Sequence, residues 1–327
     1  MPFWGHFLMR ISQTMTRAFV FPGQGSQFVG MGASLAAAYP QARAVFEEVD
    51  DALEQHLSKI MFEGDESLLR LTENTQPALM AMSMAILHVL DAGGVSVRSA
   101  ASHVAGHSLG EYTALCAAGA LSLSDTARLL KRRGQAMQQA VPVGEGAMAA
   151  LLGLEIDQVE QCLTKAATAD LICAIANDNA PGQVVISGHA AAVDAVINLA
   201  KEQGAKRAML LPVSAPFHCP LMQPAADEMR TALNEAAMAA PCVPVICNIT
   251  AAPERDPEIL RRLLVEQVTG RVRWRESAAA LSGFGIDQVV EIGAGKVLTG
   301  LVKRIDRTLA LVNIQDPADI DDFAASL

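Results

Sequence analysis

A serine in the pattern G-x-S-x-G stands at the centre of a segment that predicts a strand, a sharp turn and a helix. Gly106, Ser108 and Gly110 occupy the three fixed places. In a nucleophile elbow the serine adopts a strained backbone conformation that exposes its hydroxyl, and small neighbours let the chain turn tightly. Backbone N–H groups at the start of the next helix, including that of Leu109, would stabilise an oxyanion. The motif alone leaves both a catalytic serine and a plain strand-to-helix turn open.

A serine nucleophile needs a base, and the chain offers seven histidines. His218 is the best candidate, because it lies in a rigid loop between Pro216 and Pro220. His103 and His107 belong to the elbow itself, where their side chains cannot easily curl back onto the serine hydroxyl. No acidic residue stands where the third member of a triad is expected, so a backbone carbonyl is the alternative partner of the base.

A second glycine-rich loop follows the first predicted strand, at Pro22 to Gln27. It is not a dinucleotide fingerprint, because Phe28 stands where the third glycine belongs, and it has no lysine for a phosphate-binding P-loop. Its amides could donate hydrogen bonds into a site. A long helix is expected farther on, over Ala78 to Leu90, opened by Gln76-Pro77.

The composition indicates an α/β protein with a large core. The chain has 327 residues, of which 51% are hydrophobic and 18% charged. Segments rich in Val and Ile alternate with helical patterns throughout, which is typical of α/β folds. The net charge of −10 argues against nucleic acid as the main partner. The apolar run near the amino terminus is too short for a membrane span, so no membrane association is expected.

The cysteines give no sign of a metal or redox site. All six are scattered, and no C-x-x-C pair occurs among them. We therefore expect free thiols in the reducing cytoplasm, and neither a metal nor a cofactor.

Changes in pattern along the chain predict a large unit interrupted by a small one. Residues 142–213 follow a proline- and glycine-rich hinge and show the order β-α-β-β-α-β, which predicts a small ferredoxin-like subdomain. Residues 15–141 and 214–327 would then form the large subdomain. The first convincing strand follows Met15, so residues 1–14 are expected to be an extension.

These motifs, taken together, resemble those of the malonyl-CoA:acyl carrier protein transacylase family. The similarity extends from Thr16 to about Asp316, and its motifs follow the family's order. The matching segments are Phe21–Gln27, Gly106–Tyr112, Arg133, Pro181–Gly188, Ser214–His218 and Glu266–Val268. The resemblance implies an α/β-hydrolase-like core with a parallel sheet, carrying an inserted ferredoxin-like subdomain.

The resemblance also implies a catalytic apparatus. Ser108 would carry the malonyl ester, and His218 would be the base of a Ser–His dyad. Gln267 matches the residue whose backbone carbonyl orients that histidine, which would explain the missing acid. Gln24 and Leu109 match the residues whose backbone N–H groups form the oxyanion hole.

Further residues are assigned to the substrate by the same resemblance. Arg133 matches the arginine that binds the malonyl carboxylate, and Asn177 and Asn179 match polar residues near the cleft. Malonyl-CoA and acyl carrier protein are the implied partners, the chemistry belongs to fatty acid biosynthesis, and we expect a monomer. An acidic carrier would need a local positive surface on this acidic chain. The candidates are Lys131, Arg132, Arg271, Arg273, Lys296, Lys303 and Arg304.

Two alternatives stay open on the sequence. A serine thioesterase or hydrolase would show the same elbow, although it would usually carry an acid to complete a triad and would not need Arg133. A related acyltransferase could use another acyl group or another carrier.

Overall fold

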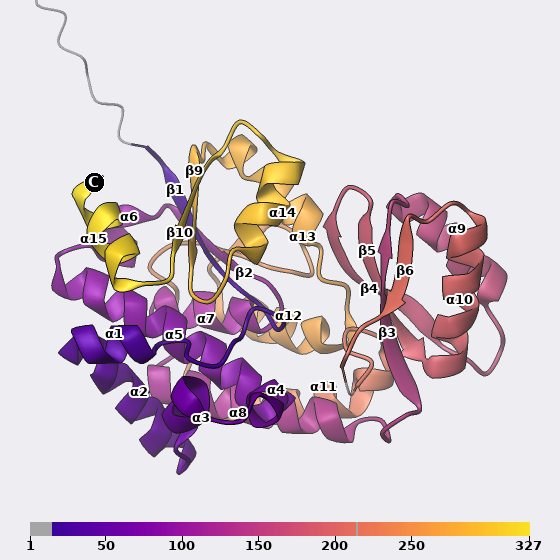
Figure 1. The fold of residues 1–327 in the computed structure, drawn as a ribbon, viewed down its shortest axis with the longest axis horizontal. Coiled ribbons are helices and arrows are strands. Elements are labelled where there is room, and N and C mark those ends of the chain that lie inside the picture. Colours follow the sequence, from indigo (N-terminus) through magenta and orange to yellow (C-terminus); the bar gives the residue numbers. More distant parts are fainter. Residues whose placement is uncertain (1–14, 214) are drawn as a thin grey trace, which may run out of the picture.

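The computed structural model describes residues 15–213 and 215–327. The expected extension, residues 1–14, therefore lies outside the described residues. Two β-sheets lie side by side, each with its own helices (Figure 1). The larger sheet is six-stranded with the order β10-β9-β1-β2-β7-β8. Its strands are β1 (Arg17–Phe21), β2 (His103–Gly106), β7 (Val245–Ile246), β8 (Pro253–Glu254), β9 (Gln288–Ile292) and β10 (Ala310–Ile314).

The larger sheet is parallel from β10 to β7, and β8 pairs with β7 antiparallel. A parallel sheet is covered on both faces, so its strands are apolar along their whole length. In β1, Phe19 and Phe21 pack into one hydrophobic cluster, while Ala18 and Val20 pack into another on the opposite face. Because β1, β2 and β7 run parallel, their carboxyl ends lie at one edge, where the elbow and the glycine-rich loop meet.

Helices cover both faces of the larger sheet (Figure 1). They are α1 (Ala33–Ala38), α2 (Pro40–Leu53), α3 (Leu57–Glu63), α4 (Glu66–Arg70), α5 (Thr72–Ala92), α6 (Val97–Ala100), α7 (Leu109–Ala117), α8 (Leu123–Gln139), α11 (Gln223–Glu235), α12 (Pro257–Thr269), α13 (Trp274–Ala280), α14 (Val297–Ile305) and α15 (Pro317–Ala325). Among the described residues, none of the helices is both long enough and apolar enough to cross a membrane.

Helix α5 begins earlier than the sequence predicts. It starts at Thr72 and passes through Pro77, which was expected to open it. Proline removes a single backbone donor. The turn before it is anchored instead by side chains, because Asn74 Nδ2 donates to the Leu68 carbonyl (2.9 Å) and Thr75 Oγ1 to the Leu69 carbonyl (2.5 Å). The extra turn places Gln76 inside the helix and in the core.

The smaller sheet is antiparallel, with the order β4-β5-β3-β6. It consists of β3 (Gly146–Leu152), β4 (Cys173–Ala180), β5 (Gln183–His189) and β6 (Arg207–Leu210), with helices α9 (Ile156–Ala166) and α10 (Ala190–Glu202). The chain order β-α-β-β-α-β with this strand order is a ferredoxin-like arrangement. The expected fold class, a parallel α/β core with a ferredoxin-like insertion, is confirmed.

Strand β4 joins the small sheet to the large part of the molecule. Its Asp178 N–H donates to the Val272 carbonyl (3.0 Å), and the Val272 N–H donates to the Ala176 carbonyl (2.8 Å). The buried carboxylate of Asp178 also pairs with Arg275 of α13 at 2.8 Å. The small sheet is therefore connected to the large part by hydrogen bonds as well as by the two crossings of the chain.

Candidate active site

Tight backbone packing explains why glycine flanks Ser108 on both sides. A Cβ added at Gly106 would lie 1.9 Å from the backbone of Gly110, and one at Gly110 would lie 2.3 Å from the Phe21 carbonyl oxygen. Between them Ser108 has φ 56° and ψ −110°, at the N-cap of α7. Positive φ is strained for a residue with a side chain. The predicted strand, turn and helix therefore form a true elbow with the serine at its apex.

Asn248 stabilises the strained turn, and the sequence analysis did not single it out. Its Oδ1 accepts from the Ser108 N–H (2.7 Å), and its Nδ2 donates to the Gly106 carbonyl (2.7 Å). The residue is buried, and it lies two residues after the end of β7. A polar residue at the carboxyl end of a strand was the available signal, because β7 lies beside β2 in the parallel sheet.

The predicted nucleophile and its predicted base are in direct contact. Ser108 Oγ lies 2.7 Å from His218 Nε2. His218 Nδ1 lies 2.8 Å from the Gln267 carbonyl oxygen and 3.2 Å from that of Gly270. Because both of these partners are acceptors, Nδ1 carries the proton and Nε2 is free to accept from the serine hydroxyl. Burial, together with the nearby Arg133, lowers the pKa of His218 to about 3, so the imidazole is neutral and available as a base.

Arg133 reaches the nucleophile because α8 approaches α5 very closely. A Cβ at Gly134 would lie 2.5 Å from Glu73 Cα, so only glycine permits this approach. The guanidinium is 1% exposed. Its Nη2 donates to Ser108 Oγ at 3.1 Å. Its Nη1 donates to Gln76 Oε1 at 2.8 Å, which explains why the early start of α5 matters.

A cavity of about 110 Å³ opens above the elbow. The residues that line it are Gln24, Gln76, His107, Ser108, Leu109, Arg133, Met137, Met148, Asn177, Leu211, Val213, Phe217 and His218. Within the described residues, the backbone N–H groups of Gln24 and Leu109 have no hydrogen-bond acceptor. Two free donors beside a nucleophile suit an oxyanion.

The two predicted asparagines differ in position. Asn177 lines the cavity. Asn179 is not among the lining residues, and its Oδ1 lies 2.8 Å from His107 Nε2. It therefore contacts the elbow from the small sheet. Gln267 does not line the cavity either, because its carbonyl and its side chain contact His218 and Arg133 from behind.

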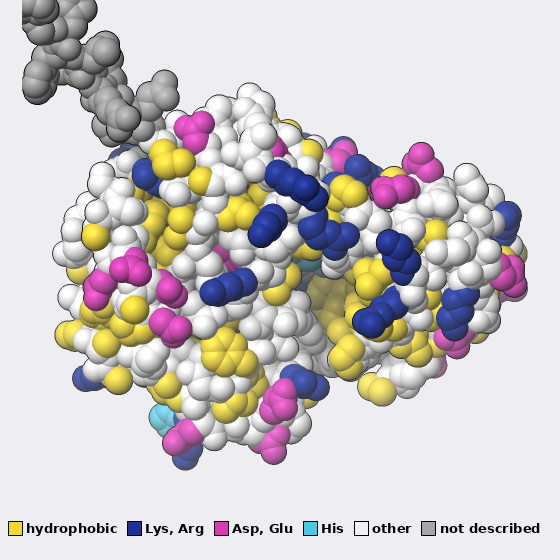
Figure 2. Space-filling model, turned by 45° about the horizontal axis from the view of Figure 1, so that its top comes forward, with side chains coloured by type: hydrophobic (Ala, Val, Ile, Leu, Met, Phe, Trp, Pro, Cys, Tyr) yellow, Lys and Arg dark blue, Asp and Glu magenta, His cyan; other side chains and the backbone are white. Residues whose placement is uncertain are grey.

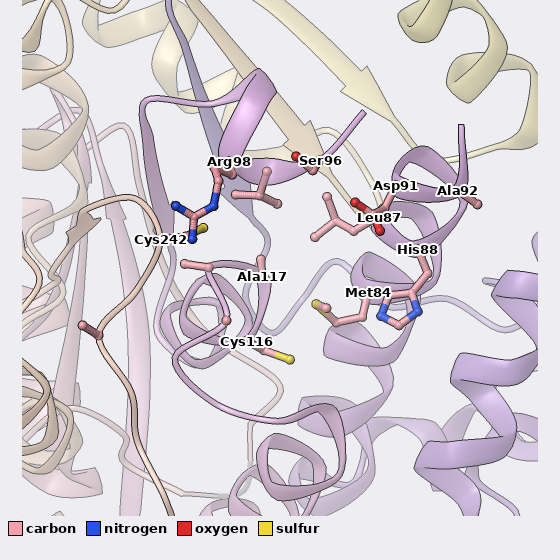
Figure 3. A pocket seen from close by; sticks show the side chains of 14 residues that line it. Met84, Leu87, His88, Asp91, Ala92, Ser96, Arg98, Cys116, Ala117 and Cys242 are labelled. Carbon is pink, nitrogen blue, oxygen red and sulfur yellow. The ribbon is translucent and has the colours of Figure 1, made fainter. Parts of the chain in front are cut away.

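A second cavity, of about 520 Å³, lies between α5, α6 and the end of α7 (Figure 3). Met84, His88, Arg98 and Cys116 line it, and none of the predicted site residues does. Cys116 is near the carboxyl end of α7, whereas Ser108 caps the amino end. A nine-residue helix is about 13 Å long, so this cavity is separate from the chemistry at Ser108.

Comparison with known proteins agrees with this geometry. The profile of the acyl transferase domain family matches residues 18–314. A malonyl CoA-acyl carrier protein transacylase of Bacillus subtilis is 45% identical over 304 residues, covering 93% of this chain and 95% of that protein. The protein of that name in Escherichia coli K12 is 43% identical over 301 residues, covering 92% and 96%.

Solved structures show the same similarity. The acyl-carrier-protein-S-malonyltransferase of Bartonella henselae superposes with a TM-score of 0.93 at 54% identity, covering 95% of this chain and 99% of that one. A malonyl-transacylase in complex with a type II PKS acyl-carrier protein superposes with a TM-score of 0.92 at 41% identity, covering 95% and 100%. The fold and the family profile define an acyltransferase. The chain belongs to the acyl transferase family and, within it, to the malonyl CoA-acyl carrier protein transacylases, which confirms the resemblance seen in the sequence.

Proposed function

We propose that this protein transfers a malonyl group from malonyl-CoA to the phosphopantetheine thiol of an acyl carrier protein, by way of a malonyl ester on Ser108. The observation that carries the proposal is the contact of one oxygen with two groups. Ser108 Oγ lies 2.7 Å from His218 Nε2 and 3.1 Å from Arg133 Nη2. A base for the nucleophile and a cation for a carboxylate thus meet at a single atom.

In the first half-reaction, Ser108 Oγ attacks the thioester carbonyl carbon as its proton passes to His218 Nε2. The Gln24 and Leu109 N–H groups would stabilise the oxyanion. The C–S bond then breaks, His218 returns the proton to the sulfur, and CoA leaves as a thiol. In the second half, the carrier thiol gives its proton to His218 and attacks the ester carbonyl. The C–Oγ bond breaks, and Ser108 recovers the proton.

Arg133 supplies the preference for malonyl. An enclosed carboxylate needs a partner to offset its desolvation, and a planar guanidinium can bind both of its oxygens. The cavity is small and Arg133 stands at the nucleophile, so an acyl group that ends in a carboxylate gains an interaction that an acetyl group lacks. Asn177, which lines the same cavity, would contact the substrate.

A thioesterase is the second candidate class. Its base would usually be oriented by a carboxylate, whereas His218 Nδ1 faces the carbonyl oxygens of Gln267 and Gly270. Intact mass analysis after incubation with malonyl-CoA separates the two classes. We expect a stable malonyl adduct of the enzyme. When holo acyl carrier protein is added, this adduct should disappear and malonyl-acyl carrier protein should form. Turnover to free malonate without any carrier would establish the hydrolase.

The nucleophile assignment is tested in the same assay. Ser108→Ala removes the only proposed covalent acceptor, so no malonyl adduct should form. The loss of one oxygen leaves the elbow backbone bonded to Asn248, so the variant should fold. A malonyl adduct on this variant would place the nucleophile elsewhere.

Ion pairs narrow the candidate surface for the acidic carrier. Lys131 and Arg132 pair with acids on neighbouring helices, and Arg271 and Arg273 pair with Glu276. The remaining candidates, Lys296, Lys303 and Arg304, lie at or in α14. Figure 2 shows Lys and Arg side chains around a hollow on one face of the molecule. We therefore place the docking surface at α14. Reversing the charge of Lys303 should slow transfer to the carrier and spare acylation by malonyl-CoA.

We further propose that the enzyme acts as a monomer in the cytoplasm. All six cysteines are free thiols, which suits a reducing compartment. Light scattering coupled to size-exclusion chromatography should give the mass of one chain, 34.5 kDa, and a mass twice as large would refute the monomer.

A further inference from the structure

Glu111 is a buried acid three residues after the nucleophile, and the chemistry described above does not use it. Its side chain is in the first turn of α7, and the residue is 1% exposed. Glu111 Oε2 accepts from Gln267 Nε2 at 2.8 Å and from the Asn248 N–H at 3.0 Å. Both donors are neutral amides. A buried carboxylate with neutral donors keeps an unbalanced charge, which is costly unless a cation is near.

Gln267 connects this carboxylate with the guanidinium of Arg133. Its Oε1 accepts from Arg133 Nη2 at 2.9 Å, while its Nε2 donates to Glu111. A guanidinium only donates and an ionised carboxylate only accepts, so the orientation of the amide between them is determined chemically. The buried anion and the buried cation are therefore separated by a single side-chain amide.

Arg133 has no ion pair with an acid in the part of the chain that the structure describes. Its hydrogen bonds go to the neutral oxygens of Gln76, Ser108 and Gln267. Burial lowers the pKa of Arg133, whereas Tyr112 and Glu111 raise it. Burial raises the pKa of Tyr112 to about 12, so this phenol is neutral near pH 7. Of these two neighbours, Glu111 is thus the one that can carry a negative charge.

We propose that Glu111 is a positioning residue for acyl selectivity: its carboxylate is the counter-charge of Arg133 in the empty site, and the carboxylate of the incoming acyl group competes with it for the guanidinium. The proposal rests on the proposed function. Two carboxylates that share one buried cation repel each other. Glu111 therefore weakens the binding of a carboxylate-bearing acyl group, and an acyl group without a carboxylate is not affected.

The variant Glu111→Gln tests the competition directly. It keeps the size of the side chain and an oxygen that can accept from Gln267 and Asn248, and it removes the charge. We expect the ratio of kcat/KM for malonyl-CoA to that for acetyl-CoA to rise on the order of tenfold, through a lower KM for malonyl-CoA. Any change in the basicity of His218 acts on both substrates alike and cancels in this ratio.

Glu291→Gln is the matched control. Glu291 is also fully buried, but it accepts from Leu298 N and Thr299 N at the start of α14 and has no link to Arg133. Its replacement should leave the ratio unchanged. In an Arg133→Ala background, Glu111→Gln should also have no effect on the ratio, because the guanidinium for which the two carboxylates compete has been removed.

An unchanged or lower ratio in Glu111→Gln would overturn the proposal, since a merely structural residue would lower activity toward both substrates. A wild-type enzyme that forms no malonyl adduct would instead overturn the proposed function. The two failures are therefore distinguishable.

A second test measures the pH dependence of the same ratio in the wild-type enzyme, so it does not depend on whether a variant folds. Burial raises the pKa of Glu111 to about 7. The titratable groups that face it are Arg133, Tyr112 and Cys247, and burial raises the pKa of that thiol far above its ordinary value. Arg133 stays protonated, and His218 stays neutral above its pKa of about 3. Between pH 6 and pH 8 Glu111 loses its proton and begins to compete. The ratio should therefore fall severalfold as pH rises, and a flat profile would overturn the proposal.

Discussion

The two walls of the active-site cavity differ in their hydrogen bonding to Ser108 and His218. The wall from the large part includes the polar side chains of Ser108, His218 and Arg133. Gln267 and Asn248 hold these residues from behind by hydrogen bonds. The other wall consists of Met148 and Asn177 of the small sheet and of Leu211, which directly follows β6. In the described residues, no hydrogen bond to Ser108 or His218 comes from the strands of the small sheet. The predicted catalytic side chains thus come from the large part, and the small part closes the cavity around them.

Among changes to the wall from the large part, removing the predicted base should have the largest effect on the rate of acylation. His218→Ala deletes the acceptor 2.7 Å from Ser108 Oγ. General-base assistance is worth ~10²–10⁴-fold, so the acylation rate should fall by about that factor. Stopped-flow measurement of CoA release at neutral pH gives this rate. A near-normal rate would mean that another group takes the serine proton.

Removing the cation should change selectivity rather than reactivity. Arg133→Ala leaves the malonyl carboxylate without a partner, at a cost of roughly 2–5 kcal/mol, and an acetyl group loses nothing. Malonyl-CoA should lose its advantage over acetyl-CoA in kcat/KM. Arg133→Lys is the informative companion, because a single ammonium cannot reproduce the two-pronged contact and should restore only part of the preference. Equal losses for both substrates would make Arg133 structural.

The support that Asn248 gives to the elbow is tested by measuring the free energy of unfolding. Asn248→Ala leaves the Ser108 N–H and the Gly106 carbonyl without their partner inside the core. Each unpaired group costs about 1–3 kcal/mol, so the free energy of unfolding in urea should fall by at least that amount. Asn313→Ala is a suitable control, because Asn313 is only partly buried and its best bond is one to the Gly295 carbonyl. A smaller loss for Asn248 than for Asn313 would contradict the role we give it.

A change in the wall from the small part should have the smallest effect on acylation. It should instead change how fast the malonyl ester hydrolyses. Leu211→Ala shortens a side chain that lines the cavity and makes no hydrogen bond to the reacting groups. Acylation by malonyl-CoA should change less than tenfold. The malonyl ester should hydrolyse severalfold faster, because water gains access to the cavity. The half-life of the adduct by intact mass measures this. An acylation defect as large as that of His218→Ala would erase the distinction between the two walls.

Much of this protein was predictable from sequence, because local patterns carry it. The elbow glycines are part of a short recognisable motif, and the glycine-rich loop and the Pro216–Pro220 segment are recognisable by their composition. The fold class and the family were confirmed. The bounds of the small subdomain, 142–213, stay a prediction, and its strands and helices lie between Gly146 and Leu210. The roles assigned to Ser108 and His218 likewise stay predictions, although the structure brings the two side chains into contact.

Tertiary structure alone decided which distant polar groups meet. The end of a strand marks Asn248 as a candidate, but only the pairing of β7 with β2 shows that it supports an elbow 140 residues away. Glu111 looks like an ordinary first-turn acid until Gln267 and Arg133 are placed beside it. The early start of α5 was also missed, because side-chain hydrogen bonds to carbonyls six residues earlier compensate for the backbone donor that Pro77 lacks. Local pattern specifies elements through short-range sterics and burial. The partner of a buried charge depends instead on how separate elements pack, and that information is spread over the whole chain.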